Sequence, residues 1–177
     1  IKKIWGIHED DIQRLLPYVR IETVPPAENK RSVYESKHVE SKRIFAPVDI
    51  NTADSTAFDD LPGIGGKLSM RIINFRKKLG GFYNIEQVGE TFALPDSTFQ
   101  IIKPRLIINN KTLLKININT ASVDEMSIHP YIRYALANAI VEYRKQHGSF
   151  LHIEDIKKIV LVTDELLLKL SPYLVVQ

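Results

Sequence analysis

The sequence contains no cysteine, a single tryptophan among its 177 residues, and no long hydrophobic run. Without thiols the chain can form no disulfide bond, no thiolate metal site and no cysteine nucleophile. No apolar stretch approaches the roughly 18–20 residues that a membrane-spanning helix needs, and no signal peptide is visible. The chain begins with Ile1 rather than methionine, so we expect it to be a fragment, with an upstream anchor or signal left open.

The chain also lacks a strong excess of either charge. Its 24 lysine and arginine residues against 21 acidic ones give a formal net charge of +3 and a pI of about 9.0. This mildly basic balance is compatible with nucleic acid or an anionic surface but alone favours neither. The five histidines have no metal-ligand spacing with acidic residues, so we expect no metal site and surface roles for them.

The chain contains an internal repeat. Residues 49–108 align without a gap on residues 117–176, and the tetrapeptide INTA stands near the start of both copies. Matches of this density in apolar and turn positions indicate tandem structural units. The predicted domains are a C-terminal remnant of a truncated unit at 1–21, a charged linker at 22–46, a first full domain at 47–110 and a second full domain at 111–177.

Each full unit has the pattern of an all-α module of four short helices. In the second unit, apolar residues between Tyr134 and His147 recur at helical spacing. Asp54 and Ser122 are predicted N-caps, and Ser122 has a glutamate three residues later, which completes a capping box. The β-branched segments RLIIN and YLVVQ could form short strands. The predicted helices are 55–60, 67–79, one opened by NIEQV and 97–102, then 123–128, 134–147, one opened by HIEDI and 164–170.

The stretch LPGIGGKLSMRII, residues 61–73, places glycines directly before a helix. Pro62 fixes its own φ, whereas Gly63 and Gly65 permit positive φ, so the segment predicts a tight turn between two helices. Backbone N–H groups of this turn and of the helix start have no partners within the helix. Together they would form an anion site suited to phosphate. Ile64 would anchor the turn in the core, and Lys67 and Arg71 would add positive charge.

Residues 49–108 resemble the helix-hairpin-helix module of the bacterial competence DNA-uptake receptor ComEA. The motifs that carry this likeness are Asn51-Thr52-Ala53, Leu61-Pro62-Gly63-Ile64-Gly65, Ile72-Ile73, Phe75-Arg76, Gly80-Gly81-Phe82 and Ile85-Glu86. The resemblance implies tandem four-helix modules with two hairpins each, which are SAM-like bundles of short helices. It also implies binding of double-stranded DNA without sequence preference. The expected phosphate-binding residues are Pro62, Gly63, Ile64, Gly65, Gly66, Lys67 and Arg71.

The other hairpins depart from this pattern. In the second unit Tyr131 and Arg133 replace the two glycines, and a tyrosine does not readily adopt positive φ. The later hairpin of each unit carries an acid, Asp96 or Asp164, and a carboxylate near a helix N-terminus repels phosphate. We therefore expect one hairpin of five, counting the N-terminal remnant, to bind DNA. Secondary basic contacts are expected from Arg76, Lys77, Arg133, Arg144 and Lys145.

The function expected from the sequence is non-catalytic, salt-sensitive binding of double-stranded DNA, with a role in DNA uptake implied by the resemblance. No cofactor is expected, and no companion catalytic domain fits into this length. The alternative is an envelope-associated scaffold whose repeats bind another protein, which the degraded hairpins and modest charge favour. A bacterial envelope or periplasmic location is expected if an anchor lies upstream, and a cytoplasmic one otherwise.

Overall fold

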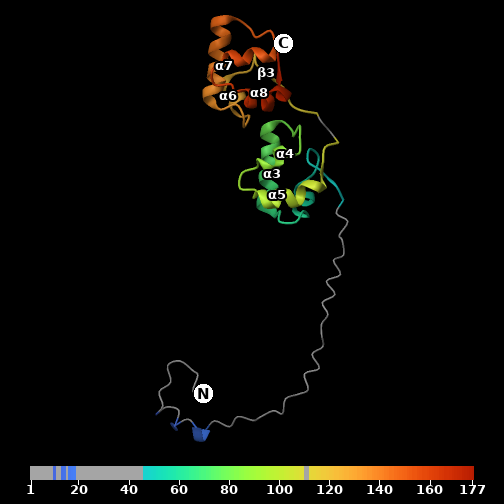
Figure 1. Cartoon of the computed structure of the whole chain (residues 1–177), viewed down its shortest axis with the longest axis vertical. Helices are drawn as coiled ribbons and strands as arrows, with labels where there is room; N and C mark the ends of the chain where they lie inside the picture. Colours follow the sequence, from blue (N-terminus) through green and yellow to red (C-terminus); the bar gives the residue numbers. More distant parts are fainter. Residues whose placement is uncertain (1–9, 11–12, 15, 19–45, 110–111) are drawn as a thin grey trace. The chain divides into compact units, whose positions relative to one another are not determined.

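The structure, a computed structural model of the chain, describes residues 10, 13–14, 16–18, 46–109 and 112–177 (Figure 1). The chain divides into two compact units, Ile1–Arg43 and Ile44–Gln177, and the second unit holds both full repeats. Of the first unit, one short 3₁₀ helix is described, η1 (Leu16–Tyr18). The expected linker and most of the expected N-terminal remnant lie outside the described residues.

The first module, residues 46–109, has the predicted four α-helices. Helices α3, α4 and α5 are labelled in Figure 1. A short 3₁₀ turn extends the last helix, and two-residue strands stand at the beginning and end of the module. Its elements are β1 (Val48–Asp49), α2 (Ser55–Asp59), α3 (Gly66–Leu79), α4 (Glu86–Gly89), α5 (Asp96–Ile102), η2 (Lys103–Arg105) and β2 (Leu106–Ile107).

The second module, residues 112–177, repeats this order. Each of its α-helices and strands begins and ends 68 residues after its counterpart in the first module, so the backbone repeats with the same period as the sequence. The third element differs, because it is a 3₁₀ helix where the first module has an α-helix. The elements are β3 (Ile116–Asn117), α6 (Val123–Ser127), α7 (Tyr134–His147), η3 (Ile153–Lys158), α8 (Asp164–Leu170), η4 (Ser171–Tyr173) and β4 (Leu174–Val175).

Short parallel strand pairs join the two ends of each module. Val48 pairs with Leu106, and Ile116 pairs with Leu174. The strands β2 and β4 lie in the RLIIN and YLVVQ segments, where the β-branched composition allowed them. Because each strand has only two residues, the all-α class predicted from the sequence holds.

The repeated asparagine of the INTA motif has a structural role. The Asn51 side chain donates from Nδ2 to the Phe82 carbonyl at 2.8 Å and accepts from the Phe82 N–H at 2.8 Å. Asn119 makes the same pair of bonds with Phe150, at 3.0 and 2.8 Å. In the loop after the long helix, these bonds satisfy the N–H and C=O groups of a phenylalanine, Phe82 or Phe150, whose ring is buried.

Both predicted N-caps are confirmed. The Asp54 carboxylate accepts from the Ala57 N–H at 2.9 Å, and Ser122 forms a reciprocal capping box with Glu125. These bonds lower the pKa of both carboxyl groups. Each module then packs around its own apolar core, with Phe58, Ile72 and Phe82 among the buried residues of the first.

Candidate nucleic-acid interface

The turn formed by residues 61–65, here called the PGIG hairpin, connects α2 to α3. Gly63 has φ of +79°, in the left-handed region that favours glycine. The Ile64 N–H donates to the Leu61 carbonyl at 3.1 Å, and the Ile64 side chain is buried, as expected. Gly65, which as a glycine could also adopt positive φ, has φ of −121°, which is extended backbone. Only Gly63 therefore needs glycine for its conformation.

Unpaired N–H groups gather at this hairpin. Within the described residues, no hydrogen-bond acceptor is found for the N–H groups of Gly63, Gly65, Gly66 and Lys67. All four residues are exposed, and Gly65, as the N-cap, has no side chain with which to satisfy the start of α3. Four donors and the positive end of a 14-residue helix thus face solvent.

The space in front of Gly65 is open. A Cβ atom placed on Gly65 would meet no described atom within 4 Å, and one on Gly66 would come near only the Asp59 carboxylate, at 3.8 Å. Neither the backbone angles nor the packing of the module therefore requires glycine at position 65. The absence of a side chain instead leaves room for an outside group to reach the amides.

The positively charged side chains of α3 differ in how far they are exposed to a bound anion. Lys67 is exposed at the first turn, next to the unpaired amides. Arg71, one turn later, is half-buried, and its guanidinium lies 5.3 Å from the ring centroid of Phe92. Lys77 is exposed in the last turn. Asp59 is the nearby acid, and it opposes an anion bound at Gly66.

Two of the residues expected as secondary contacts, Arg76 and Arg144, have guanidinium groups that bond within the fold. Arg76 donates from Nη1 to the carbonyls of Ile50 and Ala53, at 2.9 and 2.7 Å, and its burial lowers its pKa. Arg144 donates in the same way to the Ile118 carbonyl at 2.7 Å. The equivalent arginine of each long helix thus ties that helix to the INTA turn of its own module.

Three other secondary contacts were expected. Lys77 is the exposed residue of α3 described above, and the other two lie in the second module. Lys145 is exposed and forms an ion pair with Glu142 at 2.7 Å. Arg133 is exposed and stands at the N-cap of α7, the position equivalent to Gly65.

The second hairpin of the first module, residues 91–95, keeps the shape of the first without its glycines. Ala93 occupies the position of Gly63 and has φ of +60°, the only positive φ of a non-glycine residue in the described segments. The Leu94 N–H donates to the Thr91 carbonyl at 3.0 Å, matching the bond of Ile64. Phe92, at the tip, is 80% exposed. Sequence analysis missed this geometry because an alanine gives no signal of a left-handed turn.

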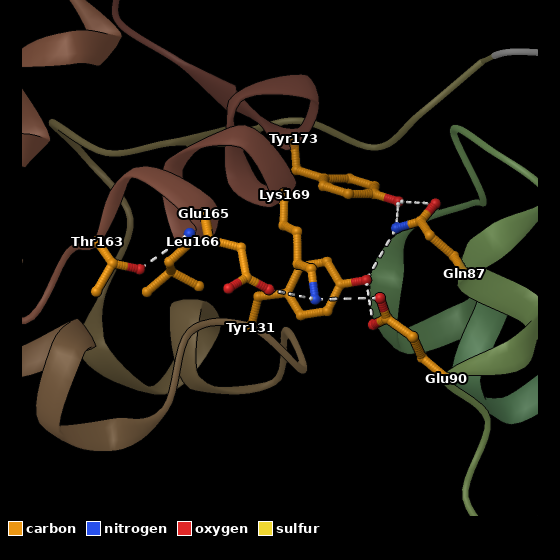
Figure 2. Close-up of polar contacts among 8 residues, drawn as sticks. All are labelled: Gln87, Glu90, Tyr131, Thr163, Glu165, Leu166, Lys169 and Tyr173. Carbon is orange, nitrogen blue, oxygen red and sulfur yellow. Dashed lines mark hydrogen bonds and ion pairs between the residues drawn. The ribbon is translucent and has the colours of Figure 1, made fainter.

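In the second module, the hairpin at residues 129–133 has a different use. Tyr131 avoids the positive φ of Gly63, as its side chain predicts. Its hydroxyl instead donates to Glu90 of the first module at 2.7 Å and accepts from Gln87 Nε2 at 3.1 Å (Figure 2). The side chain that replaces a glycine thus forms a contact between the two modules.

Gln87 is the centre of this module interface, which comprises Gln87, Glu90, Tyr131, Lys169 and Tyr173. The Gln87 side chain is 2% exposed. Its Nε2 donates to the Tyr173 hydroxyl at 2.9 Å, and its Oε1 accepts from the Tyr83 N–H at 2.8 Å. Lys169 lies 3.3 Å from Glu90 (Figure 2). Burial raises the pKa of both tyrosines, that of Tyr173 to about 12, so both hydroxyls stay protonated and able to donate.

His129 lies beside this interface and is 3% exposed, which corrects the expected surface role. Its ring centroid lies 4.7 Å from that of Tyr173 and 5.4 Å from that of Tyr131. The Tyr131 N–H donates to Nδ1 at 3.3 Å, so the neutral ring carries its proton on Nε2. Burial lowers the pKa of His129 to about 4, although the Leu79 backbone partly opposes this shift.

This buried histidine predicts a loss of stability in acid. Its folded pKa of about 4 lies below the ordinary value of 6.5, so the unfolded chain binds the proton more tightly between these two pH values. The stability that neutral His129 contributes is therefore complete above pH 6.5 and is lost as the pH falls towards 4, by about 2 kcal/mol at pH 4.5.

Urea unfolding at pH 7.5 and pH 4.5 measures this difference. His129→Phe should lose about 2 kcal/mol less than the wild type between the two pH values, because no buried imidazole remains to be protonated. His147→Phe, at an exposed position, is the matched control and should behave as the wild type. Equal pH dependence in wild type and His129→Phe would contradict the assignment.

The hairpin side of the second module has an apolar groove of about 430 Å³. Its lining includes Arg133 at the N-cap of α7 and Glu165 and Lys169 on α8, but is otherwise largely aliphatic and aromatic. The lining residues are Pro130, Tyr131, Arg133, Ala135, Leu136, Leu161, Thr163, Glu165, Leu166 and Lys169. Val160, beside this groove, is 97% exposed, and Leu161 is 51% exposed.

Two kinds of feature are absent from the part of the chain that the structure describes. Among residues 46–109, 112–177 and the few described before them, no group of three or more histidine or acidic side chains is placed to hold a metal ion. In the same residues, no helix combines the length and the apolar character needed to span a membrane.

The chain is similar to several vertebrate proteins with the same name, endonuclease/exonuclease/phosphatase family domain-containing protein 1. The Danio rerio protein is 28% identical over 138 residues, covering 68% of this chain and 25% of its own length. The Xenopus laevis protein is 22% identical over 151 residues, covering 73% and 27%, and the human protein is 22% identical over 138 residues, covering 62% and 24%. The chain thus spans about a quarter of the length of these relatives.

No solved structure matches the chain. Because the relatives are eukaryotic, they give no support to the narrower resemblance to a bacterial uptake receptor. A family model described as the helix-hairpin-helix motif matches twice, at residues 45–107 and 112–175. Since these two matches cover most of the sequence and coincide with the two modules, the chain belongs to the helix-hairpin-helix motif family.

Proposed function

We propose that the first module binds double-stranded DNA through the backbone amides of the PGIG hairpin. The observation that carries this proposal is the set of unpaired N–H groups at Gly63, Gly65, Gly66 and Lys67, facing open space at the start of α3. Phosphate oxygens are acceptors of suitable charge and size for such donors. Membership of the helix-hairpin-helix family supports the assignment.

We propose that this binding does not depend on base sequence. The donors are main-chain groups, which contact phosphates and carry no information about the bases. The first turn of α3 after the hairpin has Lys67, Leu68 and Ser69, and Ser69 is buried with its hydroxyl bonded to the Gly66 carbonyl at 3.1 Å. Only Lys67 of that turn presents an exposed polar side chain, so the turn lacks the set of polar side chains with which a recognition helix reads base edges.

The proposal predicts weak and salt-sensitive binding. Contact with two or three phosphates gives a slope of about −2 to −3 in log K against log salt concentration. Raising the salt from 50 to 200 mM should then weaken binding by roughly 10- to 50-fold. Lys67→Ala should weaken binding further and reduce the slope by about one unit, because one phosphate contact is lost.

Fluorescence anisotropy of labelled duplexes tests this prediction. Lys158→Ala is the matched control, since it removes an exposed cation that already pairs with Asp155 in the second module, and its slope should equal that of the wild type. Duplexes of unrelated sequence should bind within about threefold of one another. A slope near zero, or a strong preference for one sequence, would contradict phosphate contact as the source of affinity.

We further propose that this segment binds DNA without cleaving it, and that in a longer protein it holds DNA for another domain. The vertebrate relatives carry an endonuclease/exonuclease/phosphatase family domain in their names, and the chain matches about a quarter of each. Helix-hairpin-helix modules of low affinity would suit such a role, because they hold a duplex without fixing its sequence. A role in DNA uptake and an envelope location remain untested predictions.

A second candidate function is protein binding by the second module. The groove between its hairpins is lined mainly by apolar side chains, and Val160 and Leu161 beside it are exposed. In the equivalent hairpin of the first module, glycines stand in place of Tyr131 and Arg133 and leave open space before the amides, so the two repeats offer different chemistry to solvent. If the second module is a protein-binding scaffold, Leu161→Asp should abolish binding of the partner protein and leave DNA affinity unchanged.

A further inference from the structure

Phe92 is an aromatic side chain that the fold does not use. Its ring is 80% exposed at the tip of the hairpin 91–95, where it adds nothing to the core. The adjacent Ala93 is held at φ of +60°, a conformation that costs free energy in any residue other than glycine. The turn therefore presents the ring outward at some expense to stability.

The ring lies next to the proposed phosphate site. Arg71, on the helix that begins at the PGIG hairpin, places its guanidinium 5.3 Å from the Phe92 ring centroid. A Cβ atom on Gly63 would lie 2.9 Å from Thr98 Cγ2, so the PGIG hairpin in turn packs against the helix that follows Phe92. The two hairpins of the first module thus adjoin, and the unpaired amides and the exposed ring belong to one continuous surface.

We propose that Phe92 stacks on a DNA base exposed at a gap in a duplex, while the PGIG amides hold a nearby phosphate. This inference rests on the proposed DNA binding and adds the class of DNA that the first module prefers. Aromatic side chains on basic surfaces provide stacking platforms for unpaired bases of any sequence. Arg71 contributes positive charge beside the ring, which suits the phosphate that flanks such a base.

The cost of unstacking paired bases, compared with the affinity gained from stacking, favours binding at a gap over binding to an intact duplex. Inserting a ring between paired bases requires unstacking a base step, which lowers affinity by about a hundredfold per step. A site with two or three phosphate contacts has little affinity with which to offset that cost. At a gap the base is already unpaired, so the ring gains roughly 5- to 100-fold in affinity from stacking without that penalty.

The experiment compares two labelled DNAs of equal length, an intact duplex and one with a single-nucleotide gap, at 50 mM salt. The wild-type chain should bind the gapped DNA about tenfold more tightly. Phe92→Ala should reduce the affinity for gapped DNA to that for intact DNA, and Phe92→Trp should retain the preference. Tyr134→Ala, which removes another exposed aromatic, should bind both DNAs as the wild type does.

A fluorescent base analogue, 2-aminopurine, placed opposite the gap gives an independent readout. Its emission should fall on binding of the wild type, because stacking on an aromatic ring quenches it, and should not fall with Phe92→Ala. Equal affinity of the wild type for both DNAs, or a preference that survives Phe92→Ala, would overturn this inference while leaving the proposed function in place. Absence of binding to either DNA would overturn the proposed function as well.

Discussion

Gly65→Asp is expected to reduce the affinity for duplex DNA by at least fiftyfold while the first module stays folded. The backbone at Gly65 is extended, and a Cβ atom there meets no described atom within 4 Å, so the substitution causes no strain in the fold. Aspartate is also a better N-cap than glycine, so the stability of α3 should stay the same or rise by a few tenths of a kcal/mol. The carboxylate would, however, occupy the space before the amides and repel phosphate.

Binding and stability are measured on the same samples, by anisotropy and by thermal unfolding. Gly65→Ser separates filling of the space from repulsion of the phosphate as causes of weaker binding. Its hydroxyl can cap the helix and fill the space without charge, so it should weaken binding by a smaller factor. Arg133→Asp is the matched control at the equivalent N-cap of the second module, and it should change affinity by about threefold at most. Wild-type affinity in a folded Gly65→Asp variant would exclude the PGIG hairpin as the binding site.

The second large effect is expected at Gln87, whose substitution with alanine should lower the free energy of unfolding by about 3 kcal/mol. The amide joins both modules, since it donates to the hydroxyls of Tyr131 and Tyr173 and accepts from the Tyr83 N–H. Removing it leaves the Tyr83 N–H without its partner and takes one bond from each hydroxyl, at about 1–3 kcal/mol for each group that water cannot reach. The hydroxyls keep their bonds to Glu90 and to the Gly81 carbonyl. The melting temperature should fall by roughly 10 °C.

Gln100→Ala is the control for Gln87→Ala. Gln100 is exposed and bonds only with the neighbouring Asp96, at 3.2 Å, so its loss should cost less than about 0.5 kcal/mol. Hydrogen exchange of the second module provides a further readout, because loosening of the interface should speed exchange near Tyr173 as well as near Gln87. A loss confined to the first module would show that the interface contributes little to stability.

The helices and the PGIG hairpin could be predicted because their signals are local. Asp54 and Ser122 are good N-caps by residue type, and the glycines before α3 mark a turn that a side chain would obstruct. Even there the details differ, because Gly63 takes the left-handed conformation and Gly65 does not. The sequence shows that both are glycines but does not show that one serves the turn and the other leaves open space.

The rest of the site depends on contacts between distant residues, for which the sequence has no local signal. Replacement of a glycine by Tyr131 predicted the loss of a phosphate site, but not the bond to Glu90, which lies 41 residues earlier. Arg76 and Arg144 are of a residue type that often contacts DNA, yet their guanidinium groups donate hydrogen bonds to backbone carbonyls of the INTA turns. The exposure of Phe92 follows from a turn at an alanine, which sequence patterns assign no special conformation.

The most direct test of the account is a titration of the ¹⁵N-labelled chain with duplex DNA, followed by the amide signals in heteronuclear NMR spectra. If the unpaired donors bind phosphate, the largest shifts should occur at the N–H groups of Gly63, Gly65, Gly66 and Lys67. The amides of the equivalent hairpin at residues 129–133 should shift little. Shifts centred on that second hairpin, or none at residues 63–67 under conditions where DNA is bound, would contradict the account.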